Sequence, residues 1–175
     1  MNIPSSRNPR VTSSINPFVT SSLNPRVTSS LNPRVTSSKN PSVTSSLNPR
    51  VTSSINPKVT SSLNCKVTSS INPAVCSGLN PTVSSSLNPN ICSNIQGLYL
   101  FDLQLNSAGF TVCANDKVNL LFSPRCKFKG VLIQVRENYF NEFDLTNEWV
   151  GFWIHARNDI WLRYDLSKEW VGFTT

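Results

Sequence analysis

Asn24-Pro25-Arg26-Val27-Thr28-Ser29-Ser30-Leu31 is one of eleven copies of an eight-residue unit, here called the octad, that follow one another from residue 8 to residue 95. Asparagine opens every octad, and proline follows it in ten, with Cys65 as the exception. The fourth residue is valine or isoleucine in all copies, and the eighth is leucine or isoleucine in all but one, where Lys39 stands. Because short-period repeats determine the architecture of a chain, the fold has to be worked out from this unit.

The composition of the octad excludes a long helix. Proline every eight residues removes a backbone hydrogen-bond donor and costs roughly 3 kcal/mol at each interior helical position. Valine, threonine and leucine favour extended structure, whereas Asn-Pro favours a turn. If each octad is a short strand, alternation places its valine and its leucine on the same face.

Two structures are compatible with this pattern. In a β-solenoid, stacked coils of two or three octads would bury columns of Val and Leu/Ile. In a disordered or extended arm, no such burial occurs. Burying two large apolar side chains per octad returns about 3–6 kcal/mol, against an ordering cost of about 8–16 kcal/mol for eight residues. We therefore predict a low-complexity arm that is mostly disordered or extended, with a β-solenoid as the alternative.

The chain divides into a leader at residues 1–7, the octads at residues 8–95, and a different sequence at residues 96–175. The formal net charge of +7 is unevenly distributed, because residues 1–95 carry eight of the sixteen basic residues and the first acidic residue is Asp102. The octads therefore form a basic, Ser/Thr-rich arm, and residues 96–175 are close to neutral. Such an asymmetry favours an anionic partner.

Residues 96–175 are predicted to form a small all-β, antiparallel domain of the meander or barrel-like kind. Short runs rich in branched and aromatic residues alternate with turn residues, and Glu137 to Leu145 is the one segment where a helix is also conceivable. A 21-residue internal repeat is present, since Phe143 to Phe152 recurs as Tyr164 to Phe173. The expected strands cover residues 98–105, 110–114, 117–122, 126–136, 149–156 and 160–166.

No catalytic, cofactor-binding or metal-ligating residues are predicted. The five cysteines include no Cys-x-x-Cys pair, and the single histidine, His155, has only Cys113 and Cys126 as its nearest cysteines in sequence. A zinc site needs paired ligands of these kinds, and nucleophilic catalysis needs a base next to a nucleophile. The phosphate-binding and hydrolase motifs are also missing. We therefore expect a protein that is not an enzyme.

The leading hypothesis is a non-enzymatic structural or interaction protein, whose repetitive arm acts as a spacer or multivalent surface for a protein partner or for self-association. The chain contains no run of eighteen apolar residues, so no membrane span is predicted. It has no apolar leader of the kind that directs secretion, so an intracellular location is favoured. One alternative is a translated repetitive reading frame without selected function. The other is a nucleic-acid-binding protein that uses the cations of the arm, which are Arg10, Arg26, Arg34, Arg50, Lys58 and Lys66.

Overall fold

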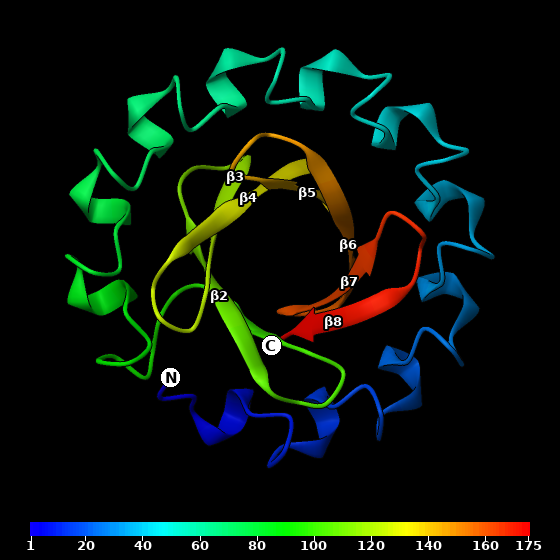
Figure 1. Ribbon diagram of the computed structural model, residues 1–175. Helices are drawn as coiled ribbons and strands as arrows, with labels where there is room; N and C mark the ends of the chain where they lie inside the picture. Colours follow the sequence, from blue (N-terminus) through cyan, green and yellow to red (C-terminus); the bar gives the residue numbers. More distant parts are fainter.

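A computed structural model describes residues 1–175, and it contains two concentric parts. The octads form a ring of short turns, and the ring encircles a β-barrel built by the rest of the chain (Figure 1). The prediction of a mostly disordered arm is wrong, because every octad has a defined and repeating conformation. The β-solenoid is wrong as well, because the octads contain no strands and go once around the barrel, not in stacked coils.

Each octad consists of two successive turns that make their own hydrogen bonds. In the octad that begins at Asn24, the carbonyl oxygen of that asparagine accepts from the backbone N–H groups of Val27 and Thr28 at 3.0 and 2.8 Å. The Leu31 N–H then donates to Thr28, which closes a 3-10 turn. The Thr28 hydroxyl donates to Ser21 of the preceding octad at 2.8 Å. Because these bonds lie within or between adjacent octads, the chain is ordered without a strand partner.

The same 3-10 turn occurs in the leader and in ten of the octads. Its members are η1 (Ser5–Arg7), η2 (Ser13–Ile15), η3 (Ser21–Leu23), η4 (Ser29–Leu31), η5 (Ser37–Lys39), η6 (Ser45–Leu47), η7 (Ser53–Ile55), η8 (Ser61–Leu63), η9 (Ser69–Ile71), η10 (Ser77–Leu79) and η11 (Ser85–Leu87). None of these turns has the length that a membrane-spanning helix needs.

The two aliphatic residues of the octad lie on opposite sides of the ring. The eighth residue faces the barrel, and Leu23, Leu47 and Ile71 are at most 1 % exposed. The fourth residue faces outward, and its exposure stays between 63 and 68 % in all eleven octads. The expectation that both share one face is wrong, because it assumed the alternation of a strand, whereas the octad turns twice between these residues.

The barrel confirms the prediction of a small antiparallel all-β fold. Each strand pairs with its sequence neighbours, and β1 pairs with β8 to close the sheet. The conceivable helix over Glu137 to Leu145 is wrong, since this segment holds a strand. The strands are β1 (Tyr99–Phe101), β2 (Ser107–Cys113), β3 (Val118–Phe122), β4 (Phe128–Arg136), β5 (Tyr139–Asp144), β6 (Trp149–Arg157), β7 (Ile160–Asp165) and β8 (Trp170–Thr174).

The barrel is built from four copies of one hairpin. Two of these copies, the 21-residue internal repeat, were recognised from the sequence. Each hairpin turn contains a residue with φ between 58 and 66°, and these residues are Leu105, Cys126, Asn147 and Lys168. A glycine stands at the fourth position after this residue in every hairpin. At Gly130, an added Cβ would lie 2.1 Å from the carbonyl oxygen of Phe143, so the approach of the neighbouring strand requires glycine there.

The two faces of the barrel belong to two separate hydrophobic clusters. The outer cluster joins buried aromatic residues of the barrel to the inward leucines of the ring. Within it, the Tyr164 hydroxyl donates to the Leu31 carbonyl at 2.7 Å, and the Asn141 amide donates to the Leu47 carbonyl at 2.9 Å. The inner cluster fills the barrel with Leu100, Leu121, Leu132, Phe140, Trp153 and Trp161. The ring therefore covers an apolar surface that an isolated barrel would expose to water.

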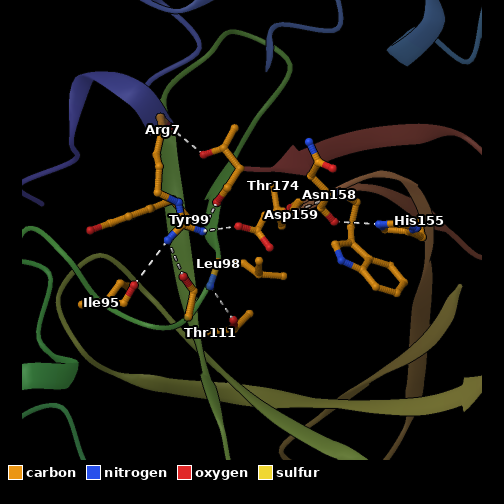
Figure 2. Close-up of polar contacts among 12 residues, drawn as sticks. Arg7, Ile95, Leu98, Tyr99, Thr111, His155, Asn158, Asp159 and Thr174 are labelled. Atoms are coloured by element: carbon orange, nitrogen blue, oxygen red, sulfur yellow. Dashed lines mark hydrogen bonds and ion pairs between the residues drawn. The ribbon is translucent and has the colours of Figure 1, made fainter. Parts of the chain in front are cut away.

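The leader closes the ring by taking the place of a twelfth unit. The Asn2 N–H donates to the Pro89 carbonyl at 2.6 Å, which joins the two ends of the ring. The Arg7 guanidinium donates to the carbonyl oxygens of Ile95, Gly97 and Thr175 (Figure 2). Burial lowers the pKa of Arg7, although Asp159 and Tyr99 oppose this shift. One side chain thus ties the ring to the residues that precede the first strand and follow the last strand of the barrel.

Candidate functional site: the ring–barrel seam and the outer belt

Three octads of the ring correspond to one hairpin of the barrel. Arg34 forms an ion pair with Glu169, and Lys58 forms one with Glu148. From Arg34 to Lys58 the chain advances by three octads along the ring, whereas from Glu169 to Glu148 it goes back by one hairpin of the barrel. The directions differ because the ring and the barrel wind in opposite senses (Figure 1). Two other kinds of contact repeat with the same shift. Arg26 lies over Trp170, and Arg50 lies over Trp149. Arg157 donates to the Ser14 carbonyl, and Arg136 donates to the Ser38 carbonyl.

The basic side chains that we proposed as a nucleic-acid interface lie along this seam between ring and barrel. Besides the two ion-paired cations, Arg10 donates to the Leu105 carbonyl at 3.0 Å and to the Asn106 side chain at 2.7 Å. The guanidinium groups of Arg26 and Arg50 lie 5.7 and 5.5 Å from the ring centroids of two barrel tryptophans. Among the six proposed cations, only Lys66 forms no such contact with the barrel. The arm is therefore basic in sequence, but most of its cations have partners inside the chain.

The one hairpin that carries a lysine at the seam corresponds to a neutral ring residue. The position that holds Glu169 and Glu148 in two hairpins holds Lys127 in another. The ring residue that corresponds to Arg34 and Lys58 at that hairpin is Thr82, which is neutral. A basic residue there would face the lysine, and like charges at close range are unfavourable. At these three hairpins the ring and the barrel therefore place no like charges at corresponding positions.

The outer surface of the ring carries one aliphatic side chain per octad. Its third residue, which precedes the valine, changes among Arg, Phe, Ser, Lys, Ala, Thr and Asn, whereas the outward fourth residue is valine in ten octads and isoleucine in one. This contrast arises within the same copies, so duplication alone does not account for it. We call these eleven side chains the outer belt, made of Val11, Val19, Val27, Val35, Val43, Val51, Val59, Val67, Val75, Val83 and Ile91.

The histidine and the two cysteines nearest to it in sequence are not brought together. The His155 ring nitrogen Nε2 lies 2.7 Å from the Asn158 carbonyl oxygen, and the imidazole packs on Trp161 with centroids 4.8 Å apart (Figure 2). Cys113 and Cys126 form no pair with it, and all five cysteines are free thiols. Burial raises the pKa of Cys126 and of Cys65, which lowers their reactivity as nucleophiles. No three His, Cys, Asp or Glu residues are grouped to hold a metal ion.

The acidic residues that the 21-residue repeat aligns have a structural role. The Asp144 carboxylate accepts from the N–H groups of Thr146 and Glu148 at 2.8 and 2.9 Å, and the Thr146 hydroxyl lowers the pKa of this carboxyl. Asp165 accepts from the Glu169 N–H in the next hairpin at 2.9 Å. These carboxylates therefore hold the turns of the hairpins.

The outer belt was missed because the strand model placed its valines inside. The invariance of the fourth residue beside the variable third residue was visible in the sequence, and it could have indicated a surface under constraint. Comparison with protein-family models, curated proteins and solved structures finds no match to this chain.

Proposed function

We propose that the protein is a non-enzymatic interaction protein whose outer belt binds several copies of one protein partner. The observation that carries this proposal is the outer belt itself, which presents eleven equivalent aliphatic side chains that are largely exposed to solvent. Single exposed valines are ordinary on protein surfaces. Ten valines and one isoleucine at one position of a repeat, next to a position that varies freely, favour a selected contact.

A convex belt of identical units suits a multivalent contact. Each octad offers one valine or isoleucine close to exposed serines, such as Ser29 and Ser30, so any single contact is small and weak. Because the ring is closed and attached to the barrel by many contacts, neighbouring octads are held at fixed separations. Several weak sites at fixed separations raise the overall binding strength through effective concentration. The multivalent surface of our leading hypothesis is kept in this proposal, and the flexible spacer is not.

Two alternatives receive less support from the contacts. A nucleic-acid interface would need cations that are free to pair with phosphates, whereas the cations of the seam contact the barrel. A repetitive reading frame without selection would not be expected to match its repeat to a second repeat of different length. The shared register of octads and hairpins therefore favours a selected fold.

The proposal can be tested by changing the belt without changing the fold. Replacing Val27, Val35, Val43 and Val51 by threonine keeps the shape of each side chain and makes its exposed end polar. The matched control replaces four exposed serines of the same octads, Ser30, Ser38, Ser46 and Ser54, by alanine, because the seventh residue of the octad also accepts glycine and asparagine. Full-length chains would be used for affinity capture from the native cells, followed by native mass spectrometry of the eluted complexes.

The expected result is a partner that the wild type and the serine variant retain, that the threonine variant loses, and that is present in more than one copy per chain. The proposal is refuted if the threonine variant captures the same proteins as the wild type, or if the partner binds in one copy.

A further inference from the structure

The end of the barrel that carries the four hairpin turns opens into a hollow of about 230 Å³. Its wall combines an apolar side with a small number of charged groups, which is the usual character of a small-molecule site at the mouth of a barrel. The volume is below that of a typical drug-sized pocket. The apolar side is formed by Leu100, Ala108, Leu121, Phe122, Phe143 and Val150, and the charged groups belong to Lys129, Glu142, Asp144 and Arg163.

The fourfold repeat shows which of these residues depart from the barrel's own pattern. Leu100, Leu121, Glu142 and Arg163 occupy the same position of the four hairpins. Two hairpins fill this position with leucine, so the barrel accepts an apolar layer there. The other two carry an ion pair instead. A buried ion pair is often no more stabilising than apolar residues of similar volume, so packing alone does not explain this choice.

The Glu142 carboxylate is held by three side-chain hydrogen bonds. Glu142 is 5 % exposed, and its oxygens accept from Arg163 Nε at 2.7 Å and from Arg163 Nη2 at 2.8 Å. The Trp153 indole donates a third hydrogen bond at 2.7 Å. Burial alone would lower the pKa of Arg163, but the hydrogen bonds and charge of Glu142 outweigh it, so the net shift is upward. The guanidinium is therefore charged and fixed in orientation.

The guanidinium keeps donors that nothing in the chain uses. Arg163 Nη1 forms no hydrogen bond, and the side chain is 33 % exposed at the hollow. Lys129 lines the same hollow at a position where the other hairpins carry alanine or valine, and its ammonium group forms no ion pair. Asp144 also lies on the wall as a carboxylate, where its Oδ1 atom accepts three hydrogen bonds from its own turn and its Oδ2 atom accepts none. Unused donors thus adjoin an apolar wall.

We propose that the barrel mouth binds a small carboxylate with an apolar body, with the carboxylate on Arg163 and Lys129 and the body against the leucine side of the hollow. A guanidinium presents planar N–H donors that match a carboxylate. Inorganic phosphate would meet the same donors but would leave the apolar wall in contact with water. This site is independent of the outer belt, because it lies inside the barrel.

The test is calorimetric titration of the full chain with sodium benzoate and sodium octanoate. Benzyl alcohol and 1-octanol serve as neutral probes, and inorganic phosphate serves as an anion without an apolar body. The decisive variant is Glu142→Leu with Arg163→Leu, which copies the layer that the other two hairpins already have. Lys117→Val removes a cation at the opposite end of the barrel and is the matched control.

We expect one of the carboxylates to bind at one site per chain, at least tenfold more tightly than its alcohol and than phosphate. Binding should weaken at least tenfold in the double leucine variant, which keeps its far-ultraviolet circular dichroism and its cooperative unfolding, and should be unchanged in Lys117→Val. Lys129→Val, which copies Val150, should weaken binding without affecting the fold. The proposal is overturned if neither carboxylate binds, if alcohol or phosphate binds equally well, or if the double leucine variant folds and binds like the wild type.

Discussion

A single octad allows the ring's contribution to barrel stability to be measured, because Leu47 and Val43 belong to the same copy of the repeat. Leu47 is fully buried at 0 % exposure, and its carbonyl accepts from Asn141 of β5. Truncating such a leucine to alanine costs about 2–5 kcal/mol, depending on how far the cavity collapses. Val43 is 66 % exposed, and truncation of an exposed side chain changes stability by no more than about 0.5 kcal/mol.

The assay is urea unfolding of the full chain followed by tryptophan fluorescence. All four tryptophans lie in the barrel, in β6, β7 and β8, so the fluorescence reports the barrel while the substitution lies in the ring. Leu47→Ala should lower the free energy of unfolding by about 2–5 kcal/mol in this barrel signal, and Val43→Ala should leave it nearly unchanged. An unchanged midpoint in Leu47→Ala, or equal losses in both variants, would refute the assignment of the two faces.

Four further predictions follow from individual contacts. Tyr164→Phe removes a buried hydrogen bond to Leu31 and should cost about 0.5–1.5 kcal/mol in urea unfolding, whereas Tyr139→Phe removes a buried hydroxyl without a partner and should be neutral or stabilising. Burial raises the pKa of both tyrosines, so the fold requires their neutral forms. The stability that this contributes is complete below the ordinary tyrosine pKa of about 10 and falls as the pH rises above it. In a pH series of melting temperatures, the double phenylalanine variant should therefore show a smaller loss than the wild type. Gly151→Ala places a Cβ 2.5 Å from the Tyr164 carbonyl oxygen and should lower the melting temperature, while Gly78→Ala meets nothing within 4 Å and should raise it or leave it unchanged. Lys39 stands at the eighth position of its octad, where burial and the nearby Arg136 lower its pKa. Lys39→Leu restores the octad pattern and should stabilise the protein by about 1 kcal/mol at neutral pH. A loss of stability would contradict the inward placement of the eighth residue.

The barrel was largely predictable because local sequence determines it. Alternating runs between turn residues indicated the positions of six of the eight strands or parts of them. The strand β5 was ambiguous because its polar residues weaken the pattern, and β8 was not assigned. The fourfold repeat was also present in the sequence, since Gly109, Gly130, Gly151 and Gly172 recur at one constant spacing. Only the last two hairpins were recognised, because the side chains between the glycines differ in the first two.

The ring was not predictable from the octads alone. The comparison of burial with entropy assumed that the repeats must bury their side chains against one another. In the structure, leucines such as Leu47 pack against aromatic residues of the barrel, which lie far away in sequence, and prolines such as Pro41 are buried as well. The turns of the ring contain no residue with positive φ, so they form without glycine. The stabilising surface therefore belongs to the other half of the chain.

The charged pair at the barrel mouth could not be recognised from the sequence for a similar reason. Glu142 and Arg163 belong to successive hairpins, but only the pairing of the strands into a closed barrel makes them neighbours. Without the fourfold alignment, neither residue could be recognised as a departure from a leucine position.

The central claim is that ring and barrel form one cooperative structure, and hydrogen exchange of the full chain measured by mass spectrometry tests it most directly. In each octad, backbone hydrogen bonds such as that of Thr28 to Asn24 should protect the amides, and the ring should open only when the barrel does. We predict that peptides from residues 8–95 and from the barrel strands exchange with the same free energy of opening. Exchange of the octad peptides within seconds, while the barrel stays protected, would contradict the account.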